Sequence, residues 1–242
     1  SKNYGGLENL SLIPGNVGTC PIQNIGAYGV ELCDVCDWVE YLDLPSGEFV
    51  RISTAECQFA YRESIFKDKL RNLAVVTAVG LRLTKRWQPR LAYGPLQSFD
   101  PATVTAHEIF ERVCQVRSEK LPDPAVLGNA GSFFKNPIVS AACYLDLAQR
   151  FPTIVGYAQA DATVKLAAGW LIEQAGLKGF VLGNVAVHDK QALVLVNRGG
   201  ATGHDICRLA LHVIEQVRDK FGVVLEAEPR IIGANGEGDL HV

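Results

Sequence analysis

The chain has 242 residues, of which 48% are hydrophobic, and its formal net charge is −3. This length and composition exclude a disordered protein and suffice for one large domain or two small ones. The small charge provides no field that would attract nucleic acid or an anionic membrane, and the apolar stretches are too short to span a bilayer.

The first part of the chain predicts loops. The segment 5–29 is rich in glycine and is broken by Pro14 and Pro21, so we expect turns that let the backbone approach a ligand closely. It contains no glycine-rich phosphate-binding motif. The chain opens without a secretory signal and has no methionine, and we interpret it as a fragment or processed product of a longer protein.

Strands are expected next, followed by a helix. The segment 30–50 predicts strands around a turn at residues 45–47, and the β-branched run 75–83 predicts a buried strand. Thr105 and Glu108 have the spacing of a capping box, which predicts a helix ending within 117–120. The prolines that follow in Leu121–Pro124 predict a domain boundary.

The remainder of the chain mixes helices and strands. Helices are expected from Ser140 to Gln149, over 167–175 and over 204–221, and strands over 192–196 and 223–232. Gly176 and Gly222 would end two of the helices. The last strand would place Glu226 and Glu228 on one face. Because there is no regular βαβ alternation, the expected fold class is α+β.

The segment Gly128–Pro137 is the most informative run. It places the hydroxyl of Ser132, the ammonium of Lys135 and the amide of Asn136 between glycines that free the backbone and a proline that fixes it. Two phenylalanines within the run can anchor it to a core. Its composition alone leaves two interpretations open, a tight turn and a small-molecule site.

Cysteines and histidines give little support for metal chemistry. Seven cysteines without disulfide spacing indicate a reduced, cytoplasmic protein. Cys33 and Cys36 have no second pair at zinc spacing, so we interpret them as ordinary buried thiols. The histidines form no metal-binding or triad pattern, His204 and His212 are assigned to one helix, and we expect no metal.

Several segments, taken in their order along the chain, resemble segments of a known family. They are Leu7–Leu10, Ile13–Gly18, Pro21–Glu31, Tyr61–Lys67, Lys120–Pro124, Gly128–Pro137 and Val164–Ile172. Together they resemble the bacterial UDP-N-acetylenolpyruvoylglucosamine reductases, flavoenzymes of the second step of peptidoglycan precursor synthesis. The resemblance covers essentially the whole chain, and the loop that carries Tyr93 is similar to that of the longer, type I form.

The resemblance implies an organisation and a reaction. It implies the C-terminal part of an FAD-binding domain at 1–121, lacking the N-terminal pyrophosphate-loop subdomain, a substrate-binding α+β domain at 122–222, and a C-terminal strand or tail at 223–242 that returns to the active site. NADPH would reduce FAD, which would reduce UDP-N-acetylglucosamine enolpyruvate to UDP-N-acetylmuramate in the bacterial cytoplasm. This serves cell wall biogenesis, cell shape and cell division, in a monomeric full-length enzyme without nucleic acid or membrane partners.

Site residues are implied by matching positions to the family. Ser132 would be the proton donor, Arg62 would bind the substrate carboxylate, and Glu228 would lie beside the enolpyruvyl group. Substrate-binding residues would be Tyr28, Tyr93, Lys120, Asn136, Tyr157, Lys165 and Gln191. Flavin-contacting residues would be Ile13, Gly15, Thr19, Ile25 and Ala27. Thr19-Cys20 departs from the two small residues of many relatives, and Cys20 is given no role.

Three functional hypotheses remain. The first is a piece of the flavin reductase in which FAD binding is impaired, so that the chain cannot turn over alone, because a pyrophosphate loop supplies anion-binding groups. The second is an isolated UDP-sugar-binding module without redox activity. The third, another flavoprotein with a shared FAD domain, is weaker, since such a protein would not be expected to carry the Ser132 run together with the Arg62 and Glu228 segments.

Overall fold

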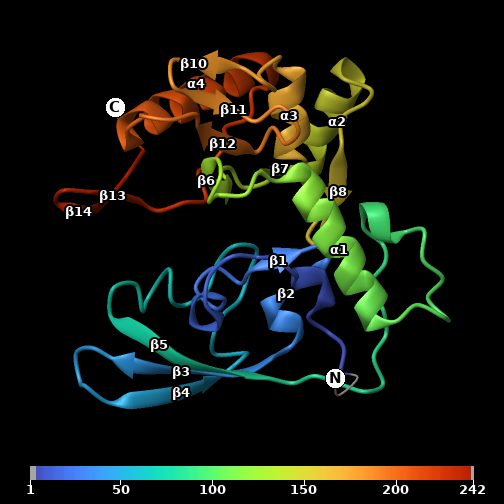
Figure 1. The fold of residues 1–242 in the computed structure, drawn as a ribbon, viewed down its shortest axis with the longest axis vertical. Coiled ribbons are helices and arrows are strands. Elements are labelled where there is room, and N and C mark those ends of the chain that lie inside the picture. Colours follow the sequence, from blue (N-terminus) through green and yellow to red (C-terminus); the bar gives the residue numbers. More distant parts are fainter. Residues whose placement is uncertain (1–3, 241–242) are drawn as a thin grey trace. The chain divides into compact units, whose positions relative to one another are not determined.

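The structure is a computed structural model that describes residues 4–240. The chain divides into two compact units, Ser1–Arg117 and Ser118–Val242. Each unit combines helices with antiparallel strands (Figure 1). Each unit also has its own hydrophobic core. The expected α+β class is confirmed, while the three-part division at residues 121 and 222 stays a prediction.

An antiparallel sheet forms the centre of the first unit. Its strands are β3 (Cys36–Asp43), β4 (Phe49–Ser53) and β5 (Ala74–Leu81), with β3 between the other two. Val39 and Tyr41 of β3 are buried with Phe66 in the core of this unit. The predicted turn at 45–47 is confirmed, because Gly47 has a φ of 73° and its N–H donates to the carbonyl of Asp43 at 2.8 Å.

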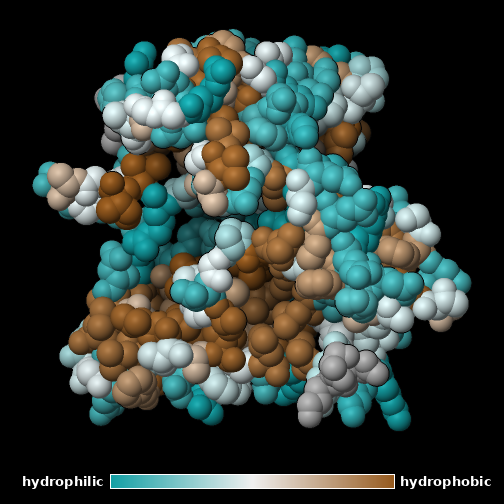
Figure 2. Space-filling view, viewed as in Figure 1, coloured by the Kyte–Doolittle hydropathy of each residue, from teal (hydrophilic) through white to brown (hydrophobic). Residues whose placement is uncertain are grey.

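The strand β5 is not the buried strand that was predicted over 75–83. Val75 is 50% exposed, and Phe49 on β4 is 68% exposed. Both are paired with Leu42 of β3, so the three apolar side chains are neighbours, and Figure 2 shows a brown area over these strands. β-Branched residues favour a strand whether or not both of its faces are covered, so composition predicted the strand but not its burial.

Loops and short turns make up much of the rest of the first unit, as predicted for 5–29. They include the turns of 3₁₀ helix η1 (Glu8–Leu10), η2 (Val17–Thr19), η3 (Leu32–Asp34) and η4 (Gly94–Leu96) and the paired strands β1 (Gly26–Ala27) and β2 (Val30–Glu31). The fully buried Asn9 ties two of these loops together. Its Nδ2 donates to the carbonyls of Tyr28 at 2.9 Å and Arg90 at 3.0 Å.

The helix α1 (Ala106–Lys120) begins and ends where the sequence predicted. The N–H of Thr105 donates to Oε2 of Glu108 at 2.8 Å, and the N–H of Glu108 donates to Oγ1 of Thr105 at 3.2 Å. These reciprocal bonds satisfy donors that the first turn of a helix leaves open. Ile109 and Val113 on its buried side pack with Leu96.

The second unit holds two further sheets and a hairpin. One sheet has the order β10 (Val181–Leu182), β11 (Val185–Val187), β12 (Val194–Asn197) and β6 (Gly128–Ser132). The other has the order β7 (Ile138–Ser140), β9 (Thr163–Leu166) and β8 (Gly156–Ala158). The strands β13 (Ile231–Gly233) and β14 (Gly236–Gly238) form the hairpin.

Three helices pack within the second unit, at the predicted places. They are α2 (Ala141–Arg150), α3 (Ala168–Gln174) and α4 (Gly203–Phe221). Oγ of Ser140 accepts from the N–H of Cys143 at 3.2 Å, and Gly222 ends α4 with a φ of 70° that glycine adopts without strain. His204 lies in the first turn of α4 and His212 lies further along the same helix, as predicted.

The strand predicted over 223–232 is wrong for most of its length. Burial alternates along Val223–Glu226, but the segment makes only an isolated bridge, between Ala227 and Phe134, and a regular strand begins at Ile231. Pro229 interrupts the segment, and a proline has no N–H to donate to a ladder.

The cap of α4 makes stability depend on pH. The carboxylate of Asp205 accepts from the N–H and Oγ1 of Thr202, at 2.9 and 2.7 Å, and these bonds lower the pKa of Asp205. A lowered pKa contributes stability that is present above the unfolded-state pKa and is lost as pH falls through the folded-state pKa.

We expect Asp205→Asn to lower the melting temperature at neutral pH, with a difference from the parent chain that shrinks as pH falls into the acid range. Thermal melts between neutral and acid pH would measure this. Asp219→Asn, near the other end of α4, is the matched control. A difference for Asp205→Asn that does not change with pH would contradict this role of the cap.

Candidate active site

The run Gly128–Pro137 forms a strand and an extended segment rather than a tight turn. Ser132 ends β6 and pairs with Val194 of β12. The N–H of Phe133 donates to the carbonyl of Leu193 at 2.7 Å, and on the other side the N–H of Glu228 donates to the carbonyl of Phe133 at 2.8 Å. The run therefore lies between two other parts of the second unit, and this brings the segments of Ser132 and Glu228 together.

The two phenylalanines of the run anchor it, as predicted. Phe133 and Phe134 are both buried in the core of the second unit, with ring centroids 5.1 Å apart. Ser132, by contrast, is exposed. Nζ of Lys135 lies 2.5 Å from Oε1 of Glu226, so these two side chains form an ion pair across the same backbone pairing. The run therefore presents the polar side chains of Ser132 and Lys135 on a backbone that Phe133 and Phe134 anchor to the core.

The start of α3 gathers two predicted substrate-binding residues. Oδ1 of Asn136 accepts from the N–H of Ala168 at 2.9 Å. Oε1 of Gln191 lies 3.4 Å from the position that a Cβ on Gly169 would take, so a larger residue there would press on the Gln191 amide. Asn136 and Gln191 thus approach the same first turn of the helix.

Tyr157 and Lys165 form a second polar group in this unit. They are directly opposite each other on β8 and β9, and Lys165 is also opposite Ile138 on β7. Residues that face each other across antiparallel strands share one side of the sheet, so the phenol and the ammonium lie on the same side. Lys120, the last residue of α1, is exposed.

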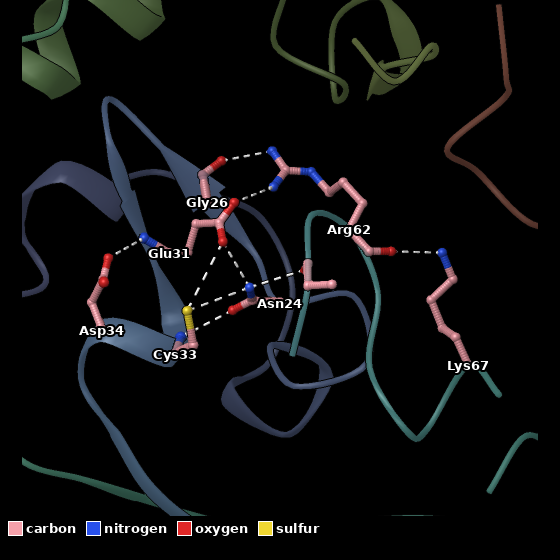
Figure 3. A network of polar contacts seen from close by, with 8 residues as sticks. Asn24, Gly26, Glu31, Cys33, Asp34, Arg62 and Lys67 are labelled. Atoms are coloured by element: carbon pink, nitrogen blue, oxygen red, sulfur yellow. Dashed lines mark hydrogen bonds and ion pairs between the residues drawn. The ribbon is translucent and has the colours of Figure 1, made fainter. Parts of the chain in front are cut away.

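In the first unit, Arg62 belongs to a polar network that also contains Asn24 and Glu31, shown in Figure 3. Its Nη2 donates to the carbonyl of Gly26 at 2.8 Å, and its Nη1 is 4.0 Å from Oε1 of Glu31. Oε2 of Glu31 accepts from Nδ2 of the buried Asn24 at 2.8 Å. A Cβ on Gly26 would lie 2.8 Å from the Glu31 side chain and 3.2 Å from Nη1 of Arg62, so this close approach requires glycine.

The loops of Tyr28 and Tyr93 meet in the same unit. Their rings are in edge-to-face contact, with centroids 6.0 Å apart. Burial raises the pKa of Tyr28, although the charge of Arg117 acts in the opposite direction. Burial in turn lowers the pKa of Arg117. The structure thus places Arg62, Tyr28 and Tyr93 in the first unit and Ser132 and the remaining substrate-binding residues at or beyond Ser118, in the second.

The predicted flavin segment offers a mixed surface. Ile13, Ile25 and Ala27 are half-buried, whereas Gly15 and Thr19 are exposed, and Gly15 has a φ of 110°. Two buried polar atoms of this unit, Oδ1 of Asn9 and Nε of Arg117, have no hydrogen-bond partner among the described residues. Nη2 of Arg117 donates to the carbonyl of Leu12 at 3.3 Å, which puts this arginine beside the segment. Half-buried apolar side chains beside buried polar atoms that lack a hydrogen-bond partner fit one part of a flavin site.

Sequence reasoning missed the residues that support Arg62 and Tyr28. Asn9, Asn24 and Glu31 are polar residues inside the strings that carried the family resemblance, and this is the one signal that could have identified them. Their contacts join residues far apart in the chain, such as Asn24 and the carbonyl of Ala60 at 3.2 Å, so no local spacing reveals them.

The structure also gives the state of the cysteines and of possible metal ligands among the described residues. The seven cysteines form no disulfide within residues 4–240. Burial is the largest cause that raises the pKa of Cys57, to about 12, so its thiol stays protonated at neutral pH. Cys33 lies in η3 and Cys36 begins β3. No cluster of three or more His, Cys, Asp or Glu side chains in the described part of the chain could hold a metal ion. Across the same residues, no helix is both long and apolar enough to cross a membrane.

Comparison with known proteins points to one family. The model of the UDP-N-acetylenolpyruvoylglucosamine reductase C-terminal domain matches residues 123–232. A UDP-N-acetylenolpyruvoylglucosamine reductase of Shewanella baltica is 94% identical over 237 residues, which are 98% of this chain and 70% of that protein. The reductase of Shewanella oneidensis is 75% identical over 242 residues, covering 100% of this chain and 71% of that protein.

Relatives with lower sequence identity belong to the same family. The reductase of Salmonella typhimurium is 57% identical over 236 residues, which are 98% of this chain and 69% of that protein. A crystal structure of UDP-N-acetylenolpyruvylglucosamine reductase from Thermus caldophilus aligns with a TM-score of 0.61 at 25% identity, covering 93% of this chain and 64% of the other. The chain thus spans about 70% of the length of the two Shewanella reductases.

Proposed function

The chain belongs to the UDP-N-acetylenolpyruvoylglucosamine reductase family, and from this premise we propose that it binds UDP-N-acetylglucosamine enolpyruvate and carries the residues that help reduce it to UDP-N-acetylmuramate. The reductant would be NADPH and the cofactor FAD, which supplies hydride transfer when bound. Ile13, Gly15, Thr19, Ile25 and Ala27 would hold part of the flavin. The half-buried apolar side chains and the unpartnered polar atoms beside them support this assignment.

Ser132, Arg62 and Glu228 would act on the reacting group. Hydride addition to C3 of the enolpyruvyl group leaves negative charge at C2, delocalised into the carboxylate. Arg62 would bind that carboxylate, because a guanidinium stays charged and offers two parallel donors. Ser132 would transfer its hydroxyl proton to C2, and a serine needs neighbours that stabilise its alkoxide in that step. Glu228, beside the same group, would help to polarise it.

The remaining predicted residues would hold the nucleotide and sugar. Tyr93 and Lys120 would contact the diphosphate, and Tyr28 would lie near the sugar and the flavin. Asn136, Tyr157, Lys165 and Gln191 would bind the nucleotide and sugar. The convergence of Asn136 and Gln191 on α3 and the pairing of Tyr157 with Lys165 support these assignments.

One structural observation supports the proposal most directly. The backbone of Phe133–Lys135 is bonded on one side to Leu193 and on the other to Glu226–Glu228. Residues that are 96 positions apart, Ser132 and Glu228, thereby reach the same small region of the second unit. A proton donor and a polarising carboxylate that act on the same substrate need to lie close together in this way.

The role in the cell follows from the reaction. The chain would act in the bacterial cytoplasm, in the synthesis of peptidoglycan precursors, and so support cell wall biogenesis, cell shape and cell division. The full-length protein would be a monomer with no nucleic acid or membrane partner.

A narrower function is favoured by the self-contained core of the second unit. Because the chain spans about 70% of the length of its relatives, we propose that it holds only part of the flavin site, binds the UDP-sugar and does not turn over alone.

The test is to add FAD to the purified chain, remove free flavin and record the visible spectrum, then titrate the UDP-sugar by calorimetry. We expect no retained flavin absorbance and saturable UDP-sugar binding. Oxidation of NADPH that depends on the UDP-sugar would contradict the partial flavin site. Absence of UDP-sugar binding would contradict the function itself.

A further inference from the structure

The guanidinium of Arg62 is held at both of its Nη atoms. Nη2 donates to the carbonyl of Gly26 at 2.8 Å, and Nη1 faces Oε1 of Glu31 at 4.0 Å (Figure 3). The side chain of Arg62 is only 16% exposed, although arginine is among the residues most often found at the surface. The guanidinium therefore has a set direction before any ligand arrives.

Glu31 is itself held by two hydrogen bonds, one of them from a buried side chain. Its Oε2 accepts from Nδ2 of Asn24 at 2.8 Å, and its backbone N–H donates to Oδ2 of Asp34 at 2.9 Å. Asn24 is 0% exposed and makes two backbone contacts besides, since its Oδ1 accepts from the N–H of Cys33 at 2.9 Å and its Nδ2 donates to the carbonyl of Ala60 at 3.2 Å. Asn24 thus joins the strand of Glu31 to the loop of Arg62.

The backbone of Arg62 is fixed as well. Its φ of 56° lies in the left-handed region, which a residue with a side chain adopts at a cost. Nζ of Lys67 donates to the Arg62 carbonyl at 2.9 Å and is 3.1 Å from Oε1 of Glu63. Such a conformation persists where surrounding contacts determine it, and here they act on both the backbone and the side chain.

We propose that Asn24 and Glu31 are positioning residues that set the orientation of Arg62 for a carboxylate ligand. This rests on the proposed function, in which Arg62 binds the enolpyruvyl carboxylate. An arginine side chain has many rotamers, and a two-point contact with a carboxylate needs one of them. Glu31 and Asn24 select that rotamer in advance, so less conformational entropy is lost when the ligand binds.

A double-mutant cycle tests whether Glu31 acts through Arg62. Dissociation constants for UDP-N-acetylglucosamine enolpyruvate are measured by calorimetry for the 242-residue chain, Glu31→Gln, Arg62→Lys and the double variant. We expect Glu31→Gln to weaken binding about ten-fold, because the guanidinium loses its charged neighbour, and a change of this size is typical of the coupling between residues in contact. In the Arg62→Lys background its effect should be at most about two-fold, because the two residues act as a unit.

Two controls separate positioning from folding. UDP-N-acetylglucosamine lacks the enolpyruvyl carboxylate, so its affinity should not change in Glu31→Gln. Glu40→Gln removes the partner of Arg51, an ion pair of 2.8 Å on β3 and β4, and should leave both affinities unchanged. An equal effect of Glu31→Gln in both backgrounds, or on both ligands, would overturn the proposal.

A ligand-free measurement tests the same proposal independently. We expect separate NMR signals for the Nη protons of Arg62 in the parent chain, because its rotation is restricted, and averaged signals in Glu31→Gln and Asn24→Asp. Asn24→Asp keeps the acceptor for Cys33 but turns a carboxylate toward Glu31. Signals that are unchanged in both variants would overturn the positioning role. A parent chain that binds both ligands equally would instead contradict the assignment of Arg62 under the proposed function.

Discussion

Replacing Phe134 with alanine is expected to lower the free energy of unfolding of the second unit by about 3–5 kcal/mol. Phe134 is 1% exposed and belongs to the main core of this unit. Its removal would leave a cavity lined by well-packed side chains, and both the lost transfer free energy and the cavity are unfavourable. Chemical denaturation followed by circular dichroism would measure the change.

The matched control is Leu145→Ala, at a residue of α2 that is 61% exposed, for which we expect a change of at most about 0.5 kcal/mol. A loss below about 1 kcal/mol for Phe134→Ala would contradict the view that this side chain anchors the Ser132 run. Phe134 bridges to Ala227, so loosening it should also release the Glu228 segment.

Replacing Lys165 with alanine is expected to weaken the binding of UDP-N-acetylglucosamine about 10- to 100-fold, because hydrogen bonds to charged groups contribute about 1.5–3 kcal/mol. Lys165 lies opposite Tyr157 on the paired strands β8 and β9, so the ammonium is presented from a regular element rather than from a mobile loop. Isothermal calorimetry on the 242-residue chain would give the affinity.

Lys178→Ala is the matched control, since Nζ of Lys178 pairs with Oε1 of Glu173 at 3.0 Å and no ligand role is proposed for it. Equal affinities for Lys165→Ala and Lys178→Ala would contradict the assignment of Lys165 to the nucleotide. A weakening in both would indicate a general effect of positive charge.

Local signals predicted the helices well. The capping box of Thr105 with Glu108, the Ser140 cap and the Gly222 stop involve residues within a few positions of each other, and all are observed. Burial of a strand depends on what packs against it, so the same reasoning failed for β5. It also overestimated the last strand, where Pro229 interrupts pairing.

Local sequence patterns predicted less of the candidate site than of the helices. The composition of the Ser132 run indicated its polar groups and its aromatic anchors, but spacing could not show that Glu228 lies beside it. That relation depends on backbone bonds between segments more than 90 residues apart. The roles of individual residues came from the family resemblance, and the support of Arg62 by Asn24 became visible only in three dimensions.

The most direct test of the proposed substrate site is a calorimetric comparison of two ligands on the unmodified chain, UDP-N-acetylglucosamine enolpyruvate and UDP-N-acetylglucosamine. We expect saturable binding of both at one site, with the enolpyruvyl compound at least about ten-fold tighter, because only it offers a carboxylate to Arg62. No saturable binding of either ligand would contradict the claim that the proposed substrate-binding residues form a UDP-sugar site.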